Sequence, residues 1–114
     1  GSDLFLMASH FEPCGLGQLI AMRYGTVPVA RNTGGLTDTV FDGVNGFMFE
    51  EANAKEMFDG IKRGVRAFEA GGAEWEKLIL AGMRHDSSWT ERAAEYVSMY
   101  DAACESRKVA CVCQ

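Results

Sequence analysis

The chain lacks the long hydrophobic runs, the clustered basic residues and the leader segment that mark several large classes of protein. Its longest apolar stretches, such as residues 4–8, are far shorter than the about 20 residues needed to cross a bilayer, so no membrane partner is expected. The net charge is −5 and the basic residues are scattered, which argues against binding to nucleic acid. No signal or transit peptide is recognisable at the start.

The four cysteines also lack the spacing of a disulfide framework. Cys14 lies in a loop motif, Cys104 lies in a helical stretch, and Cys111 and Cys113 form a Cys-x-Cys pair near the end. A lone Cys-x-Cys does not have the paired spacing of a zinc site, so no metal is predicted. Free thiols suit a reducing, intracellular compartment.

What is present is enough for one small α/β domain. The chain has 114 residues, 47% of them hydrophobic, with no internal repeat and no low-complexity linker. The apolar run at residues 3–8 predicts a strand buried on both faces of a parallel sheet. Residues 27–30 and 46–49 predict two more short strands, the last one following the turn signals Asp-Gly and Asn-Gly at residues 42–46.

Helical periodicity fills the remaining segments. Leu16, Leu19, Ile20 and Tyr24 predict one face of a helix that ends at Gly25. A short helical turn is expected at residues 36–40. Three later apolar stripes predict C-terminal helices: Met57, Ile61, Val65 and Phe68; Trp75, Leu78, Ile79 and Met83; and Ala93, Val97, Tyr100 and Cys104. This order corresponds to half of a doubly wound α/β domain over residues 1–108, with a frayed tail at 109–114.

The candidate chemistry lies in the loops after the first two strands. Ligands of parallel α/β sheets bind at the carboxyl ends of the strands, where both glycine-bearing loops are expected. Gly15 and Gly17 precede a helix N-terminus, whose unpaired N–H groups favour a diphosphate. Glu12, held by Pro13, could accept hydrogen bonds from a sugar hydroxyl or stabilise positive charge at an anomeric carbon.

A dinucleotide-binding loop is the alternative interpretation of the same glycines. Gly15 and Gly17 form Gly-x-Gly, and Arg31 after the second strand could accept a 2′-phosphate. However, the third glycine position holds Ile20, and six residues separate the strand from the first glycine where a tight turn is required. Both departures disfavour this alternative.

The full motif is longer than either loop. It reads Asp-Leu-Phe-Leu-Met-x-Ser-x-Phe-Glu-Pro-Cys-Gly-Leu-x-Gln-Leu-x-Ala-Met-Arg-Tyr-Gly-x-Val-Pro-Val from residue 3, then Thr-Gly-Gly-Leu-x-Asp-Thr-Val at residues 33–40. It resembles the C-terminal domain of ADP-glucose-dependent bacterial glycogen synthases and plant and algal starch synthases. Glu-Trp at residues 74–75 and Asp-Ser-Ser-Trp at residues 86–89 agree, so the resemblance extends to about residue 103.

The resemblance implies a fold, an activity and a location. The fold would be a partial Rossmann-like domain, the C-terminal half of the C-terminal domain of a GT-B glycosyltransferase, with short parallel strands and C-terminal helices. The activity would be that of a retaining hexosyltransferase that moves glucose from ADP-glucose to the non-reducing end of an α-1,4-glucan, with no cofactor and no metal. The protein would act in the plastid stroma if it is plant or algal, or in the cytoplasm if it is bacterial.

Site residues follow from the resemblance by position. Glu12 matches the active-site glutamate beside the donor glucose. The backbone of Cys14, Gly15 and Leu16 would bind the glucose hydroxyls, and that of Gly17 and Gln18 would bind the diphosphate. A second loop, formed by Thr33, Gly34 and Gly35, would line the cleft. Gly17 stands where the family often has Thr, which removes a hydroxyl but no backbone N–H.

Large parts of such an enzyme are absent from the chain, namely the N-terminal domain and the upstream basic residues that contact the diphosphate. We therefore expect the isolated chain to be inactive, with an unpaired strand edge and uncovered apolar helix faces. One alternative is a truncated, non-catalytic paralogue that binds glucan or a synthase partner. Another is a GT-B enzyme that uses a different nucleotide sugar, such as UDP-glucose.

Overall fold

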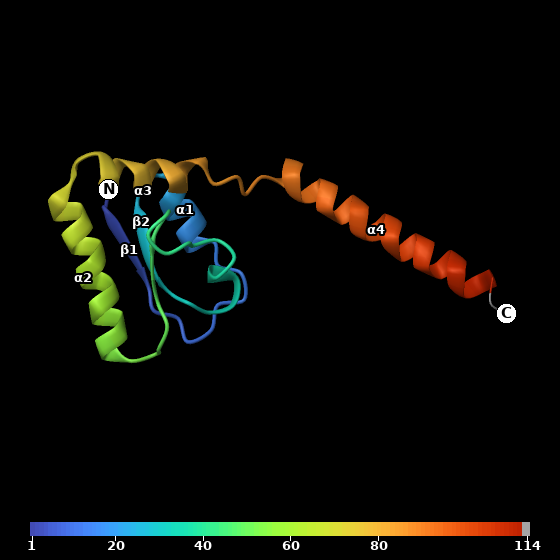
Figure 1. Ribbon diagram of the computed structural model, residues 1–114, viewed down its shortest axis with the longest axis horizontal. Helices are drawn as coiled ribbons and strands as arrows, with labels where there is room; N and C mark the ends of the chain where they lie inside the picture. Colours follow the sequence, from blue (N-terminus) through green and yellow to red (C-terminus); the bar gives the residue numbers. More distant parts are fainter. Residues whose placement is uncertain (113–114) are drawn as a thin grey trace.

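Three short parallel strands form the sheet of this protein, in the order β1-β2-β3, and helices lie on both of its faces (Figure 1). The computed structural model describes residues 1–112. The strands are β1 (Leu4–Met7), β2 (Val27–Arg31) and β3 (Phe47–Phe49); the helices are α1 (Gly17–Arg23), the 3₁₀ turn η1 (Gly34–Leu36), α2 (Ala54–Ala70), α3 (Gly72–Arg84) and α4 (Trp89–Val112). The predicted α/β class and the parallel strands are confirmed.

The central strand β2 divides the core into two layers. Its side chains alternate, so that Val27 and Val29 face the layer of α2 and α3, whereas Ala30 faces the opposite layer. The first layer contains Val27, Val29, Phe47, Phe49, Trp75 and Leu78, and the second contains Ala30, Leu36 and Val40. All four apolar side chains of β2 are buried, which is typical of an inner strand of a parallel sheet.

Helix α2 lies close to the sheet because two glycines face it. A Cβ atom at Gly60 would lie 3.2 Å from Phe49 Cδ1, and one at Gly64 would lie 3.2 Å from both Leu4 Cδ2 and Val29 Cγ2. The helix is held at its start by Asn53, whose side chain accepts a hydrogen bond from the N–H of Glu56 at 2.9 Å. Of the apolar stripe predicted for α2, Met57 and Ile61 pack against the core, whereas Val65 and Phe68 are exposed. The buried residues of the helix are the two glycines, which allow its close approach to the sheet.

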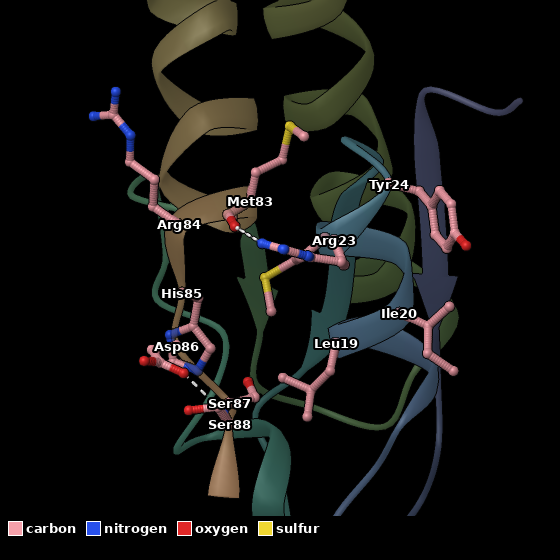
Figure 2. A pocket seen from close by; sticks show the side chains of 12 residues that line it. Leu19, Ile20, Arg23, Tyr24, Met83, Arg84, His85, Asp86, Ser87 and Ser88 are labelled. Atoms are coloured by element: carbon pink, nitrogen blue, oxygen red, sulfur yellow. Dashed lines mark hydrogen bonds between the residues drawn. The ribbon is translucent and has the colours of Figure 1, made fainter. Parts of the chain in front are cut away.

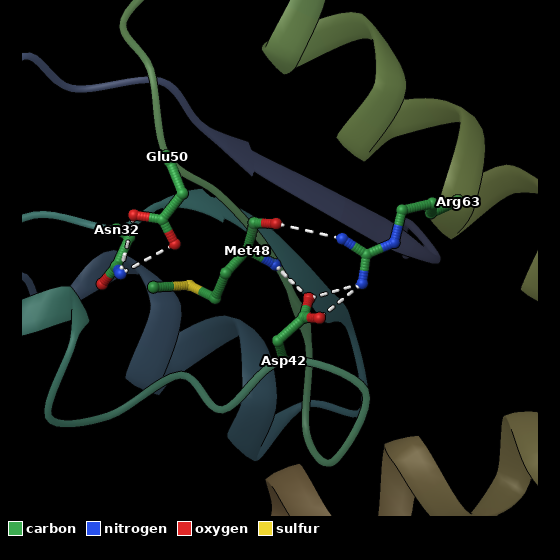
Figure 3. A network of polar contacts seen from close by, with 5 residues as sticks. All are labelled: Asn32, Asp42, Met48, Glu50 and Arg63. Atoms are coloured by element: carbon green, nitrogen blue, oxygen red, sulfur yellow. Dashed lines mark hydrogen bonds and ion pairs between the residues drawn. The ribbon is translucent and has the colours of Figure 1, made fainter.

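The outer edge of β3 is closed by side chains. Met48 N donates to Asp42 Oδ1 at 2.7 Å, and Arg63 Nη1 of α2 donates to Met48 O at 3.1 Å (Figure 3). Arg63 Nη2 also lies 2.6 Å from both Asp42 carboxylate oxygens. Because this ion pair is exposed, it contributes at most about 1 kcal/mol to stability. Its clearer effect is to occupy backbone groups that another strand could otherwise pair with.

The prediction that the first strand is buried on both faces was wrong. Strand β1 is an edge strand, and its central residues Phe5 and Leu6 are 36% and 45% exposed. The apolar run is that of an inner strand, but within the described residues β1 has a partner strand on one side only. The predicted unpaired edge is thus present at β1.

Helix α1 also packs on a different face from the predicted one. Leu16, Ile20 and Tyr24 are 70%, 58% and 85% exposed, whereas Gln18 and Met22 are the buried residues. Met22 packs against α3 at Gly82, where a Cβ atom would lie 3.2 Å from Met22 Cγ. The predicted end of the helix is confirmed, because Gly25 follows it with φ +78°.

The C-terminal helix α4 extends away from the α/β body (Figure 1). It confirms the helix predicted from Ala93, Val97, Tyr100 and Cys104, but this stripe is exposed. Residues 109–112, predicted as a frayed tail, continue the helix, since no glycine or proline interrupts them; residues 113 and 114 lie outside the described part. No helix in the described range has the length and apolar character required to span a membrane.

We expect Gly64→Val to destabilise the protein by about 1–3 kcal/mol, because the added methyl groups would overpack the contact with Leu4 and Val29. Urea unfolding measures the change. The matched control is Arg66→Val, at an exposed position of the same helix, which should change the free energy of unfolding by less than about 1 kcal/mol. Equal losses for the two variants would contradict close packing at Gly64.

Candidate functional site

Two loops meet at the carboxyl edge of the sheet. The Glu12 loop (residues 8–16) follows β1, and the Gly34 loop (residues 32–40) follows β2. The N–H of Gly35 donates to the carbonyl oxygen of Glu12 at 2.8 Å, which joins the loops directly. The candidate site therefore consists of one joined structure, with the predicted carboxylate on one loop and the predicted glycines on both.

The contact is so close that only glycine fits on one side of it. A Cβ atom at Gly34 would collide with the Glu12 carbonyl group, and Gly34 also has φ +51°. A Cβ atom at Gly35 would lie 2.7 Å from both the Cα and the carbonyl oxygen of Cys14. These glycines thus support the Glu12 loop, a role that sequence reasoning missed. Whether Thr33, Gly34 and Gly35 also contact a ligand stays a prediction.

The Glu12 side chain is half-buried at the bend of its loop. The hydroxyl of Ser9 donates to Glu12 Oε2 at 3.3 Å, so the carboxylate has an orienting partner within its own loop. The neighbouring Cys14 is exposed, and its thiol is free. A partly accessible carboxylate in this position can accept hydrogen bonds from a sugar or face a developing positive charge.

The entry to α1 presents main-chain donors. Gly15 has φ +72°, which turns the chain into the helix, and Leu16 at the N-cap makes no side-chain capping bond. The first N–H groups of a helix have no acceptor within the helix, so they can bind an anionic oxygen. Gly17 begins α1 beside Phe5 of β1, where a Cβ atom would lie 3.2 Å from Phe5 Cε1.

Gln18 is fully buried beneath these loops, although the family resemblance implied only its backbone as a contact. Its Nε2 donates to Gly15 O at 2.9 Å and to Thr39 Oγ1 at 3.1 Å. Cys14 O, at 3.3 Å, shares one of the two amide hydrogens. The signal in the sequence is a single carboxamide among apolar residues, in the first turn of α1 directly after the loop. That signal does not reveal on which side of the helix the carboxamide is buried.

The Arg31 side chain links the Glu12 loop to the residue that follows β3. Its Nη1 donates to the carbonyl oxygen of His10 at 2.6 Å, and its Nε donates to that of Glu50 at 3.1 Å. The side chain of Asn32 donates to the Glu50 carboxylate at 3.0 Å (Figure 3). Nε and Nη1 of Arg31 are thus engaged by main-chain carbonyls, a structural role that disfavours the 2′-phosphate contact of the dinucleotide alternative.

A hollow of about 680 Å³ lies away from these loops, between α1 and residues 82–88 (Figure 2). Arg23 Nη1 crosses it to donate to Met83 O at 3.0 Å. The N–H of Ser88 donates to Asp86 Oδ1 at 2.7 Å and thereby lowers the pKa of Asp86. None of the predicted site residues lines this hollow, so its size alone does not make it the site.

Among the described residues, no group of three or more His, Cys, Asp or Glu could hold a metal ion.

Comparison with known proteins identifies the family. The family model described as "Glycosyl transferases group 1" matches residues 1–66, which is more than half of the chain. The chain belongs to the group 1 glycosyl transferases.

Its relatives within this family include glycogen synthases. The chain is 50% identical over 109 residues to the glycogen synthase of Geotalea uraniireducens, covering 90% of this chain and 22% of that one. For the glycogen synthase of Syntrophotalea carbinolica the identity is 49% over 111 residues, with 92% and 23% covered. The chain therefore spans less than a quarter of the length of these relatives.

Solved structures agree with this similarity. The catalytic domain of starch synthase IV from Arabidopsis thaliana, bound to ADP and acarbose, is 40% identical with a TM-score of 0.81, covering 90% of this chain and 22% of that one. Sucrose-phosphate synthase from Thermosynechococcus elongatus is 24% identical with a TM-score of 0.68, covering 91% of this chain and 26% of that one, and shows the fold alone. The expected partial Rossmann-like fold of a GT-B glycosyltransferase is confirmed.

Gly35→Ala should separate the two loops, because its Cβ would press on backbone atoms of Cys14 and Pro13 that have no free rotation to move away. We expect faster hydrogen exchange in residues 9–17 and a lower Tm. Asp38→Ala is the control, at an exposed position of the same loop, and should change neither. Unchanged exchange in Gly35→Ala would show that the loops are not held by this contact.

Proposed function

We propose that this chain forms part of a starch or glycogen synthase that transfers glucose from ADP-glucose to the non-reducing end of an α-1,4-glucan. One observation carries the proposal: Glu12 and both glycine loops meet at the carboxyl edge of the sheet. The sequence that forms this arrangement is 50% and 49% identical to two glycogen synthases over the aligned residues. The ADP and acarbose bound to the similar starch synthase IV domain support a nucleotide-sugar donor and a glucan acceptor.

In this proposal Glu12 is the catalytic residue of the chain. Its carboxylate lies beside the donor glucose, where it accepts hydrogen bonds from the sugar and stabilises the positive charge that develops at the anomeric carbon. The main-chain N–H groups of Cys14, Gly15 and Leu16 bind the glucose hydroxyls, and those of Gly17 and Gln18 bind the diphosphate. Because these groups are already fixed before the donor binds, little reorganisation accompanies the reaction.

In this proposal, the rest of the site comes from parts of the synthase other than these 114 residues. The N-terminal domain of such a synthase would close over the donor and supply cationic groups for the leaving diphosphate. Positioning and charge neutralisation of this kind account for a large part of the rate enhancement of glycosyl transfer. The enzyme would act where its glucan is made, in a plastid stroma or a bacterial cytoplasm.

Glu12→Gln in the full-length protein should lower kcat by about 10²–10³-fold, because the charge facing the transition state is lost while the shape is kept. Glucose transfer from ADP-glucose to glycogen is the assay, and Tm should be nearly unchanged. Glu51→Gln, an exposed glutamate after β3, is the matched control and should retain full activity. Unchanged turnover in Glu12→Gln would remove Glu12 from the mechanism.

The purified 114-residue chain should transfer no measurable glucose from ADP-glucose, because the groups that neutralise the diphosphate lie elsewhere. The full-length protein assayed under the same conditions is the control. Robust glucan elongation by the short chain would contradict this expectation.

Preference for UDP-glucose by the full-length protein would favour a different donor. Glucan co-sedimentation without nucleotide-sugar binding would favour a non-catalytic binding module.

A further inference from the structure

We propose that Gln18 is a positioning residue of the donor site, whose buried carboxamide holds the Glu12 loop and the Gly34 loop in one arrangement. The inference rests on the proposed function, since it concerns the site at which the donor would bind. This role of the Gln18 side chain is distinct from the backbone contact that the family resemblance implies.

The hydrogen bonds form a closed circuit through both loops. Gln18 Nε2 donates to Gly15 O at 2.9 Å and to Thr39 Oγ1 at 3.1 Å. Thr39 Oγ1 in turn donates to Gly35 O at 3.1 Å, and Gly35 N donates to Glu12 O at 2.8 Å. The circuit begins and ends in the Glu12 loop, so movement of either loop breaks at least one of these bonds.

The orientation of the carboxamide is determined by its surroundings. The carbonyl oxygens of Cys14 and Gly15 cannot donate, so the atom that faces them must be the NH₂ group of Gln18. Its Oε1 is buried and has no hydrogen-bond partner among the described residues. A buried polar atom without a partner destabilises a fold. A methionine of similar length would fill this space without that cost, so the carboxamide contributes directional bonds that packing alone does not provide.

The position of this circuit makes it relevant to transfer. It fixes the main chain on both sides of the Glu12 carboxylate and at the entry to α1. Misplacing a reacting group by about 1 Å can lower the rate about 100-fold. The Gln18 side chain touches neither donor nor acceptor, because it is fully buried under the loops that do, and its role is separate from the main-chain N–H proposed to bind the diphosphate.

The test uses the full-length synthase that contains this chain. Gln18→Met should lower kcat about 10- to 100-fold while the KM for glycogen stays unchanged, because the acceptor does not depend on these bonds. Thr39→Val, which loses the hydroxyl, should show the same fall in kcat. Thr39→Ser, which keeps the hydroxyl, should retain the kcat of the wild type. Leu78→Ala, a core change in α3 on the other side of the sheet, should lower Tm with little effect on kcat.

Two kinetic results would overturn the proposal. One is an unchanged kcat in Gln18→Met. The other is a loss of kcat in Leu78→Ala equal to that in Gln18→Met, which would indicate general destabilisation. If Gln18→Met does not fold, the comparison of Thr39→Val with Thr39→Ser decides.

A second readout separates this proposal from the proposed function. If the wild-type protein does not use ADP-glucose, hydrogen exchange still reports on the loops. Faster exchange of residues 9–17 and 33–40 in Gln18→Met, with unchanged exchange in α3, would support the positioning role. Equal exchange of these loops in the variant and the wild type would overturn it.

Discussion

The close approach of the Gly34 loop to the backbone of the Glu12 loop is the constraint on which the candidate site depends. Side chains are excluded at Gly34 and Gly35 because carbonyl and Cα atoms of residues 12–14 occupy that space. The contact joins the loops that follow the paired strands β1 and β2, and Glu12 is half-buried at the bend. A ligand at this edge would therefore meet a surface built from two loops that cannot easily move independently. Such rigidity suits a reaction in which charge develops at a fixed point.

The packed layers below the loops hold the strands from which the two loops extend. Glycines at positions 60 and 64 bring α2 close to the sheet, and the apolar residues of β2 fix the register between the strands that carry the loops. The outer edge of β3 is closed by Asp42 and Arg63, whereas β1 has an open edge and exposed apolar side chains. In a chain that spans less than a quarter of its relatives, this asymmetry identifies β1 as the side with unsatisfied packing.

Much of the fold could be predicted from the sequence, because strands, turns and helix ends have local causes. The apolar runs at β1 and β2 and the glycine that ends α1 all lie where expected. Burial was less predictable. The stripe of Leu16, Ile20 and Tyr24 has helical spacing, but spacing does not show which face is covered, and here the polar Gln18 is buried instead. The loops were located correctly, while the packing role of Gly35 depends on a contact between residues 21 to 23 positions apart in the sequence.

Hydrogen exchange of the full-length protein, with and without ADP-glucose, tests most directly whether the two joined loops form the donor site. If they do, we expect the donor to slow exchange at the amides of residues 14–18 and in the Gly34 loop together. Protection confined to the hollow between α1 and residues 82–88, or protection of one loop without the other, would contradict it.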